Sequence, residues 1–133
     1  SIVGEPMSIE NDGRPKVVAF LAHWCPHCQA EVPRLTAWAE AGNAPDDVYI
    51  VAVSTNVSQV RENFPPSDWL DEEGWPFPTM KDDAASSAHL AFGAGGFPYF
   101  VVVDADGNVV NRTSGELTEG QIEQLIEQAR AGA

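Results

Sequence analysis

The sequence predicts an α/β fold in which helices flank a mixed central β-sheet, and three observations lead to this prediction. Short apolar runs at 16–22 and 48–54 are typical of strands buried in a sheet. A helical pattern over 26–41 separates them, and strand, helix and strand at this spacing form a right-handed unit with parallel strands. Residues 99–112 then predict an antiparallel hairpin. Parallel and antiparallel pairs together give a mixed sheet.

The first helix has recognisable ends. Pro26 suits the first helical position, where a missing N–H costs nothing, and Gly42-Asn43 provides a stop. One face of this helix carries apolar residues, namely Val32, Leu35, Trp38 and Ala39. This face is expected to pack against the sheet.

The segment between the second strand and the hairpin is expected to be mostly helical. One or two short helices are predicted within 57–73, interrupted at Pro65-Pro66. Residues 75–78 contain two prolines and should be extended, since a residue before proline avoids the helical region. Another short helix is expected over 84–92, followed by a loop over 93–96.

The hairpin and the last helix carry the clearest local signals. The strands at 99–103 and 108–112 flank Asp104-Ala105-Asp106-Gly107, in which Gly107 should take a positive φ. The final helix should begin after Thr118. Thr118 and Gln121 can form a capping box, with Leu117 and Ile122 as its hydrophobic staple. The stripe that follows Ile122 consists of Leu125, Ile126 and Ala129.

Length, composition and charge restrict the class of protein. The 133 residues, of which 44% are hydrophobic and 20% charged, are expected to form one domain over 1–133. No apolar run approaches the roughly 20 residues of a membrane span, and no cleavable signal is visible at the N-terminus. The net charge of −13 argues against nucleic acid and anionic membrane surfaces as partners.

The two cysteines, Cys25 and Cys28, are separated by only two residues. A disulfide closing so short a loop removes little chain entropy, so this pair is better explained by chemistry than by stability. At the strand-to-helix boundary Cys25 becomes the N-cap, where the free N–H groups and the helix dipole favour its thiolate. A protonated His27 would add a positive charge near the same sulfur. Cys28, one turn deeper, should resolve the mixed disulfide that Cys25 forms.

Two other interpretations of the cysteines remain open. They could be ordinary buried thiols, or they could bind a metal with His23 and His27, while His89 approaches from a distant segment. A second ligand pair at zinc spacing is lacking, so no metal ligand is assigned. Gln29 follows Cys28, and this excludes the C-x-x-C-H pattern of haem attachment.

The segment from Trp24 to Leu35 has the pattern W-C-x-x-C-x-x-E-x-P-x-L. It resembles the extracytoplasmic thioredoxin-like proteins of the TlpA, ResA and DsbE group, in which these positions are fixed. Later matches are Phe77-Pro78, Gly96-Phe97-Pro98 and the turn at 104–107. The resemblance covers the chain from about residue 14 and implies a thioredoxin-like fold with a helical insertion after the first βαβ unit.

The resemblance also implies roles for individual residues. Pro98 matches a cis-proline beside the C-x-x-C, where the backbone of Phe97 would pair with a substrate strand and Trp24 would contact it. Glu31 matches a buried acid that tunes the cysteines and shuttles protons, although a helical glutamate is as often a solvated carboxylate. Pro33 matches a helix kink. No cofactor is implied beyond the redox-active Cys25–Cys28 disulfide.

Three positions depart from the relatives. Ala19 replaces the buried aspartate of thioredoxins themselves, so Glu31 would have to move protons in its place. His27 is the residue associated with oxidising DsbA-like proteins. Phe97 is bulkier than the residue usual before the cis-proline and would shield the sulfur or select apolar substrates.

These features predict a thiol–disulfide oxidoreductase with Cys25, Pro26, His27, Cys28 and Glu31 as its catalytic residues. We expect it to act outside the cytoplasm of a bacterium, on exported proteins that contain cysteine, with a further redox partner that recycles the dithiol. A membrane tether preceding this sequence is compatible with it. His27 favours a disulfide donor. The alternatives are a specialised reductase, for example in cytochrome c maturation, and a copper or zinc chaperone.

Overall fold

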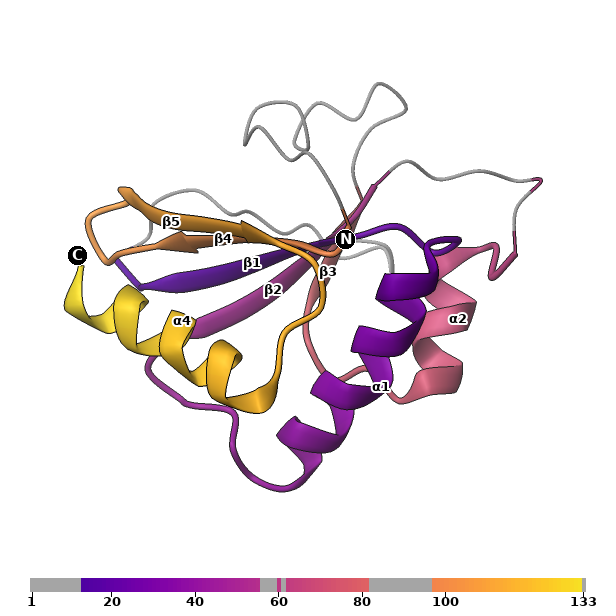
Figure 1. The fold of residues 1–133 in the computed structure, drawn as a ribbon, viewed down its shortest axis with the longest axis horizontal. Coiled ribbons are helices and arrows are strands. Elements are labelled where there is room, and N and C mark those ends of the chain that lie inside the picture. Colours follow the sequence, from indigo (N-terminus) through magenta and orange to yellow (C-terminus); the bar gives the residue numbers. More distant parts are fainter. Residues whose placement is uncertain (1–12, 56–59, 61, 82–96, 133) are drawn as a thin grey trace.

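The computed structural model describes residues 13–55, 60, 62–81 and 97–132, and within them a mixed five-stranded sheet (Figure 1). Its strands are β1 (Lys16–Leu21), β2 (Tyr49–Ser54), β3 (Thr79–Lys81), β4 (Tyr99–Val103) and β5 (Val109–Ser114). The order across the sheet is β3-β2-β1-β4-β5. β1 pairs in parallel with β2 and antiparallel with β4, which confirms the predicted mixed sheet and places β1 at its centre.

Strand β3 is the element that the sequence analysis missed. It has three residues, which follow the segment 75–78 predicted as extended, and it pairs in parallel with the end of β2. Three residues are too few to show an alternation of polar and apolar side chains. Their strand character comes from pairing with a distant segment, which local sequence does not reveal.

The described helices are α1 (Pro26–Glu40), α2 (Pro66–Glu73) and α4 (Glu119–Ala131). α1 ends one residue before the predicted limit, and α2 begins at the predicted break. All three contribute to one hydrophobic cluster with the same face of the sheet, and Figure 1 shows α1 and α4 below that face. The helix expected at 84–92 and the loop at 93–96 lie outside the described residues.

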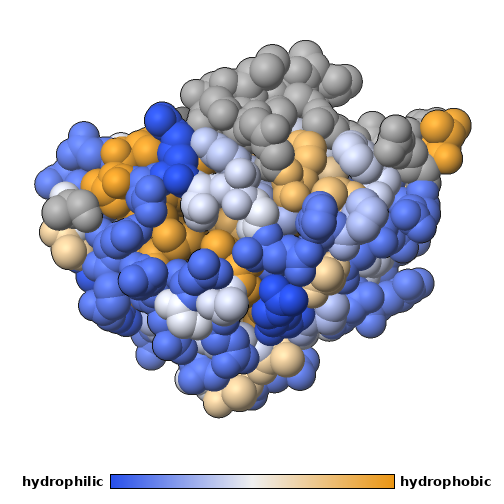
Figure 2. Space-filling model, in the orientation of Figure 1, coloured by the Kyte–Doolittle hydropathy of each residue, from blue (hydrophilic) through white to orange (hydrophobic). Residues whose placement is uncertain are grey.

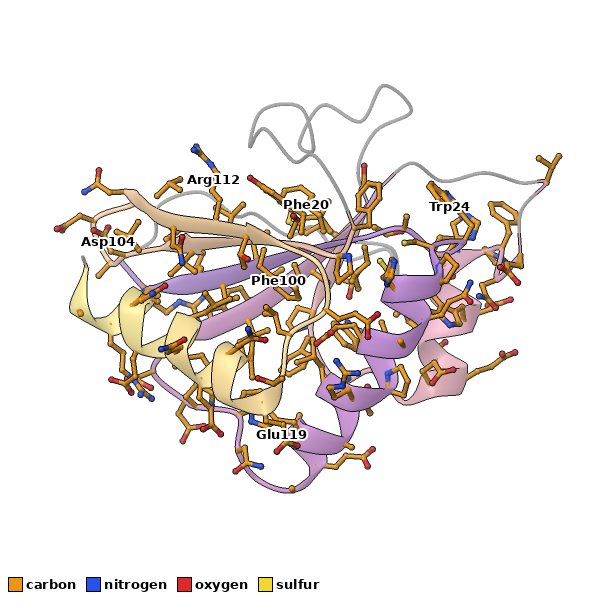
Figure 3. The ribbon with its side chains drawn as sticks, viewed as in Figure 1. Phe20, Trp24, Phe100, Asp104, Arg112 and Glu119 are labelled. Carbon is orange, nitrogen blue, oxygen red and sulfur yellow. The ribbon has the colours of Figure 1, made fainter. Side chains whose placement is uncertain are left out.

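The core follows the alternation of the central strand. Val17, Ala19 and Leu21 of β1 pack in the helical cluster together with Phe100, whereas Phe20 belongs to the cluster on the other face. Figure 3 shows Phe100 between the sheet and the helices. Each buried Val, Leu or Phe side chain among them contributes about 1.5–3 kcal/mol of hydrophobic free energy. This burial fixes β1, and therefore the residue with which the next helix begins.

The capping box of α4 is confirmed. The backbone N–H of Gln121 donates to Oγ1 of Thr118 at 3.2 Å, and the N–H of Thr118 donates to Oε1 of Gln121 at 2.9 Å. Leu117 and Ile122 are both buried in the helical cluster, in agreement with the predicted staple. These contacts fix the approach of the chain to α4, which matters below because the residues just before Thr118 contact α1.

The predicted hairpin is also confirmed, with Gly107 at φ 87°, and β5 begins one residue and ends two residues later than predicted. Oδ1 of Asp104 accepts hydrogen bonds from the N–H groups of Asp106 and Asn108, which closes the turn. Hydrophilic residues cover most of the face seen in Figure 2, and hydrophobic ones gather where α4 meets the sheet. Among the described helices, none is long and apolar enough to cross a membrane.

Candidate active site

Cys25 lies where the central strand gives way to α1, as predicted. It is the N-cap of that helix, with φ −80° and ψ 123°, and Pro26 occupies the first turn. Its side chain accepts no capping hydrogen bond, so the sulfur does not bind the N–H groups of the first turn directly. Both cysteines are free thiols, and Cys25 is 8% exposed whereas Cys28 is fully buried. Only the first sulfur can meet another protein.

The sulfur of Cys25 faces a segment far along the chain. Its Sγ lies 3.8 Å from the carbonyl oxygen of Phe97, and the Phe97–Pro98 peptide bond is cis, as the resemblance implied. The rings of Trp24 and Phe97 meet edge to face, with centroids 6.1 Å apart. The predicted substrate-contacting residues are thus gathered beside Cys25. Figure 3 shows Trp24 at the opposite end of the molecule from Asp104.

Cys28 is held as a neutral thiol. Burial raises the pKa of the Cys28 thiol well above its ordinary value of 9.0, and the negative groups Cys25 and Glu31 raise it further, while a hydrogen bond with the Ala22 backbone lowers it. At neutral pH this thiol keeps its proton. A base must remove that proton before Cys28 can attack a disulfide.

Glu31 is buried rather than solvated. Its Oε2 accepts a hydrogen bond from the backbone N–H of Leu117 at 2.8 Å and from Nη1 of Arg34 at 3.1 Å. Its Oε1 is buried with no partner among the described residues. Burial raises the pKa of Glu31 above 4.5, and the Leu117 hydrogen bond and the Arg34 charge oppose that rise. Glu31 therefore has the environment of the buried acid that the resemblance implied.

His27 contacts a carboxylate. Its Nδ1 donates to Oε2 of Glu116 at 2.8 Å, and the histidine side chain is 67% exposed. Glu116 also accepts from Nη2 of Arg34 at 3.3 Å, and the hydrogen bonds from His27 and Arg34 lower the pKa of the Glu116 carboxyl, with His27 as the larger cause. From the sequence we expected a protonated His27 to add a positive charge near Cys25. The carboxylate of Glu116 beside His27 was not foreseen.

Arg34 and Glu116 are the two site residues that sequence reasoning missed. Arg34 follows Glu31 by three positions on a helix, a spacing that places two side chains on one face and could have indicated the pair. Glu116 lies 82 residues from Arg34 and 89 from His27, and only the docking of 115–118 against α1 brings it there. No local sequence pattern predicts that contact.

His23 lies in the protein interior and is hydrogen-bonded to the backbone of another segment. It is fully buried, and its Nδ1 donates to the carbonyl oxygen of Glu62 at 2.6 Å. Its own carbonyl accepts from Asn63 at 3.1 Å, and its ring meets Phe64 at 5.9 Å. In the described part of the chain, no three His, Cys, Asp or Glu residues are arranged to hold a metal ion. His89 lies outside the described residues.

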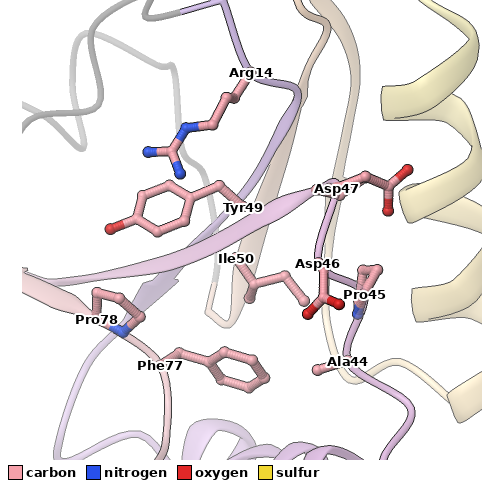
Figure 4. A pocket seen from close by; sticks show the side chains of 10 residues that line it. Arg14, Ala44, Pro45, Asp46, Asp47, Tyr49, Ile50, Phe77 and Pro78 are labelled. Atoms are coloured by element: carbon pink, nitrogen blue, oxygen red, sulfur yellow. The ribbon is translucent and has the colours of Figure 1, made fainter.

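A separate hollow of about 260 Å³ lies at the other end of the central strands (Figure 4). There the guanidinium of Arg14 stands 4.4 Å from the centre of the Tyr49 ring, and Ile50 and Phe77 line the hollow below. Arg14 precedes β1 and Tyr49 begins β2, whereas Cys25 follows the far end of β1. This hollow is therefore not part of the cysteine site.

A central strand ends in a rim thiol, a buried thiol lies one turn below it, and a cis-proline segment faces the pair; this is a paired-cysteine site on a thioredoxin-like fold. Comparison with known proteins identifies the family. Residues 4–127 match the Redoxin family model, and the chain belongs to this family.

Curated relatives carry names of the same class. The chain is 31% identical over 121 residues to the thiol:disulfide interchange protein HelX of Rhodobacter capsulatus, covering 91% of this chain and 64% of HelX. It is 28% identical over 103 residues to the thiol:disulfide interchange protein DsbE of Pseudomonas aeruginosa, covering 77% of this chain and 52% of that protein. The chain thus spans less than two thirds of either relative.

Solved structures support the fold. The crystal structure of StoA from Bacillus subtilis superimposes with a TM-score of 0.78 at 23% identity, covering 94% of this chain and 91% of that one. A secreted disulfide oxidoreductase of Mycobacterium tuberculosis matches with a TM-score of 0.67 at 24% identity, covering 88% and 83%. At these identities the likeness establishes the thioredoxin-like fold alone.

Proposed function

We propose that this protein reduces disulfide bonds in other proteins by thiol–disulfide exchange through Cys25 and Cys28. The observation that carries the proposal is the unequal placement of the two thiols. Cys25 is at the rim of the site beside the Phe97 carbonyl, and Cys28 is fully buried beneath it. This difference in depth supports Cys25 as the attacking sulfur and Cys28 as the resolving one.

The reaction starts from the reduced protein. The Cys25 thiolate attacks one sulfur of a substrate disulfide, which breaks that S–S bond, forms a mixed disulfide and releases the other substrate sulfur as a thiolate. Cys28 then gives its proton to a base and attacks Sγ of Cys25. The Cys25–Cys28 disulfide forms, the second substrate sulfur leaves, and both substrate sulfurs take up protons. Two electrons pass from the dithiol to the substrate.

Glu31 is our candidate for that base. It lies three residues after Cys28 on α1, so both side chains occupy one helix face. Its charge is close enough to raise the pKa of the Cys28 thiol. The raised pKa of the Glu31 carboxyl, caused by burial, makes it a better proton acceptor than a solvated glutamate.

The surroundings of Cys25 suit an extended substrate segment. The Phe97 carbonyl beside the sulfur can pair with the backbone of an added strand, and Trp24 and Phe97 provide apolar contact. Pro26 follows Cys25 in the first turn and leaves no backbone N–H unsatisfied there. We propose these residues as the substrate-contacting rim.

The direction of electron flow is argued from charge. The sequence alone favoured a disulfide donor, because a protonated His27 would stabilise the Cys25 thiolate and so the reduced form. In the structure His27 donates to Glu116, whose negative charge offsets that effect. The net charge of −13 also disfavours an additional thiolate. Both observations favour electron transfer from this protein to a substrate disulfide, so we propose a reductase.

Equilibration with glutathione buffers tests the direction. We expect a reduction potential near that of thioredoxin, about −270 mV. A value above about −180 mV, the range of disulfide isomerases and oxidants, would overturn the reductase direction and support the donor. Failure of the reduced wild-type protein to form the Cys25–Cys28 disulfide in oxidised glutathione, with Cys25→Ser as control, would overturn the exchange function itself.

The cellular setting follows from the relatives. A structural neighbour is described as secreted, so we propose an extracytoplasmic site, cysteine-containing exported proteins as substrates, and a dithiol partner that returns electrons to Cys25–Cys28. Maturation of cytochromes c is one such reducing task. The chaperone alternative gains no support from the described residues, which lack a three-ligand cluster.

A further inference from the structure

Arg34 stands between two carboxylates that differ in their exposure to water. Its Nη1 donates to Oε2 of Glu31 at 3.1 Å and to the carbonyl oxygen of Leu117 at 3.0 Å, while Nη2 donates to Glu116 at 3.3 Å. The Glu31 side chain is fully buried, that of Glu116 is 31% exposed, and that of Arg34 is 41% exposed. The guanidinium therefore connects the interior of the site with its surface.

This connection cannot conduct protons. A guanidinium has five donors and no acceptor, and it keeps its charge at every relevant pH, so a proton cannot pass from Glu116 through Arg34 to Glu31. Arg34 can act on Glu31 only through its positive charge and its hydrogen bond. Both favour the ionised carboxyl, in opposition to the burial that favours the protonated one.

The charges that face Glu31 come from two elements. On α1 the charged group is Arg34 and the titratable group is the neutral Cys28 thiol, and on the segment before α4 the charged group is Glu116, which contacts His27. The strands packed beneath α1 present apolar side chains there. Arg34 is thus the positive group in contact with Glu31 among the described residues, and Glu116 is the acid that competes for it.

We propose that Arg34 is a positioning residue that keeps Glu31 ionised and ready to accept the Cys28 proton, and that Glu116 weakens this effect. The inference rests on the proposed exchange reaction, in which Glu31 is the base. It predicts that the two neighbouring side chains shift the titration midpoint of Glu31 in opposite directions. Loss of Arg34 should leave Glu31 protonated at higher pH, whereas loss of Glu116 removes a repelling charge and should leave Glu31 ionised at lower pH.

The direct test uses the oxidised protein, which has no titrating thiol. The side-chain carboxyl carbon of Glu31 is followed by ¹³C NMR against pH in the wild type, Arg34→Gln, Arg34→Lys and Glu116→Gln. Arg112→Gln is the matched control, because Figure 3 shows Arg112 pointing away from the helices. We expect the Glu31 midpoint to rise in Arg34→Gln, to return toward the wild-type value in Arg34→Lys, and to fall in Glu116→Gln.

A kinetic test follows the step itself. The mixed disulfide between Cys25 and glutathione is trapped in acid, and glutathione release is measured after a jump to higher pH. On the acid side of the profile, Arg34→Gln should release glutathione about tenfold more slowly than the wild type, the effect of losing one neighbouring opposite charge. Alkylation of Cys25 in the reduced protein should be unchanged, because no described contact joins Arg34 to that sulfur.

The results distinguish failure of the role of Arg34 from failure of the exchange reaction itself. An unchanged Glu31 midpoint in folded Arg34→Gln overturns the role of Arg34, as does an upward shift in Glu116→Gln, which would indicate that disturbed packing of 115–118 moves both profiles. If Arg34→Gln does not fold, Glu116→Gln still tests the proposal, because an unchanged Glu31 midpoint in that variant overturns the competing role of Glu116. A wild-type protein that titrates as expected but never releases glutathione instead contradicts the exchange reaction.

Discussion

Nδ1 of His27 lies 2.8 Å from Oε2 of Glu116, so the residue between the two cysteines that most distinguishes this C-x-x-C is hydrogen-bonded to a carboxylate 89 positions away. The motif alone indicates a positive charge beside Cys25. In the folded protein, a carboxylate faces that histidine. The redox character of the site therefore depends on 115–118 as well as on the motif.

Glu116→Gln should make the protein more oxidising. Removing the carboxylate takes away the negative charge that faces His27, and this should favour the Cys25 thiolate and so the reduced form. We expect the reduction potential to rise by on the order of 10–30 mV, measured against glutathione. Glu119→Gln, at the exposed start of α4 (Figure 3), is the control. Equal potentials in the two variants would show that Glu116 does not influence the dithiol.

Cys28→Ser should stop the exchange reaction at the mixed disulfide between Cys25 and the substrate. Cys25 keeps its position at the rim, but the buried sulfur that would displace the substrate is gone. We expect a stable one-to-one adduct with oxidised glutathione, detected by intact mass spectrometry, whereas Cys25→Ser should form none. An adduct on Cys28 in the Cys25→Ser protein would contradict the division of roles between the two thiols.

Glu31→Gln should change how stability depends on pH. Burial raises the pKa of Glu31 in the folded protein above the ordinary 4.5, so above pH 4.5 the folded state binds a proton that the unfolded chain has already lost. Stability therefore falls as pH rises through that window, until the folded carboxyl has also ionised. Urea unfolding from pH 4.5 to 7 should show a smaller loss in Glu31→Gln.

Glu40→Gln serves as the matched control for that experiment, since Glu40 is exposed on the same helix. Its unfolding free energy should follow the wild type across the range. A Glu31→Gln protein that also follows the wild type would mean that the buried carboxyl does not oppose folding as it ionises.

Thr118→Ala should destabilise the protein by about 1 kcal/mol, because it removes the side chain that caps α4. Thr118→Ser keeps the hydroxyl and should retain most of the stability. Thermal unfolding of the three proteins measures the difference. Equal midpoints for the alanine variant and the wild type would indicate that water replaces the cap without cost.

Much of the fold was accessible from the sequence because its signals are local. The capping box at Thr118 and Gln121, the turn glycine Gly107 and Pro26 at the start of α1 each act within a few residues. Strand β3 was missed because three residues acquire strand character only by pairing with β2. The described segments thus confirm the elements with local causes and add the one that depends on distant pairing.

The site divides in the same way. The cysteine pair and its place at the helix start were predicted, since a strand–helix boundary fixes them. The burial of Glu31 was left open because a helix pattern does not show which segment covers it, and here that segment is the one ending at Leu117. Arg34 and Glu116 were missed because their roles exist only once α1 and the approach to α4 are packed together.

The difference in depth between the two sulfurs has a practical consequence. Cys25 reaches the surface and Cys28 does not, so a fluorescent maleimide applied briefly to the native protein should mark a single position without any engineered tag. The fraction of molecules that accept the dye would then count those with a free dithiol. In the purified protein, the dye-labelled fraction on a gel would therefore report how much of the protein is reduced.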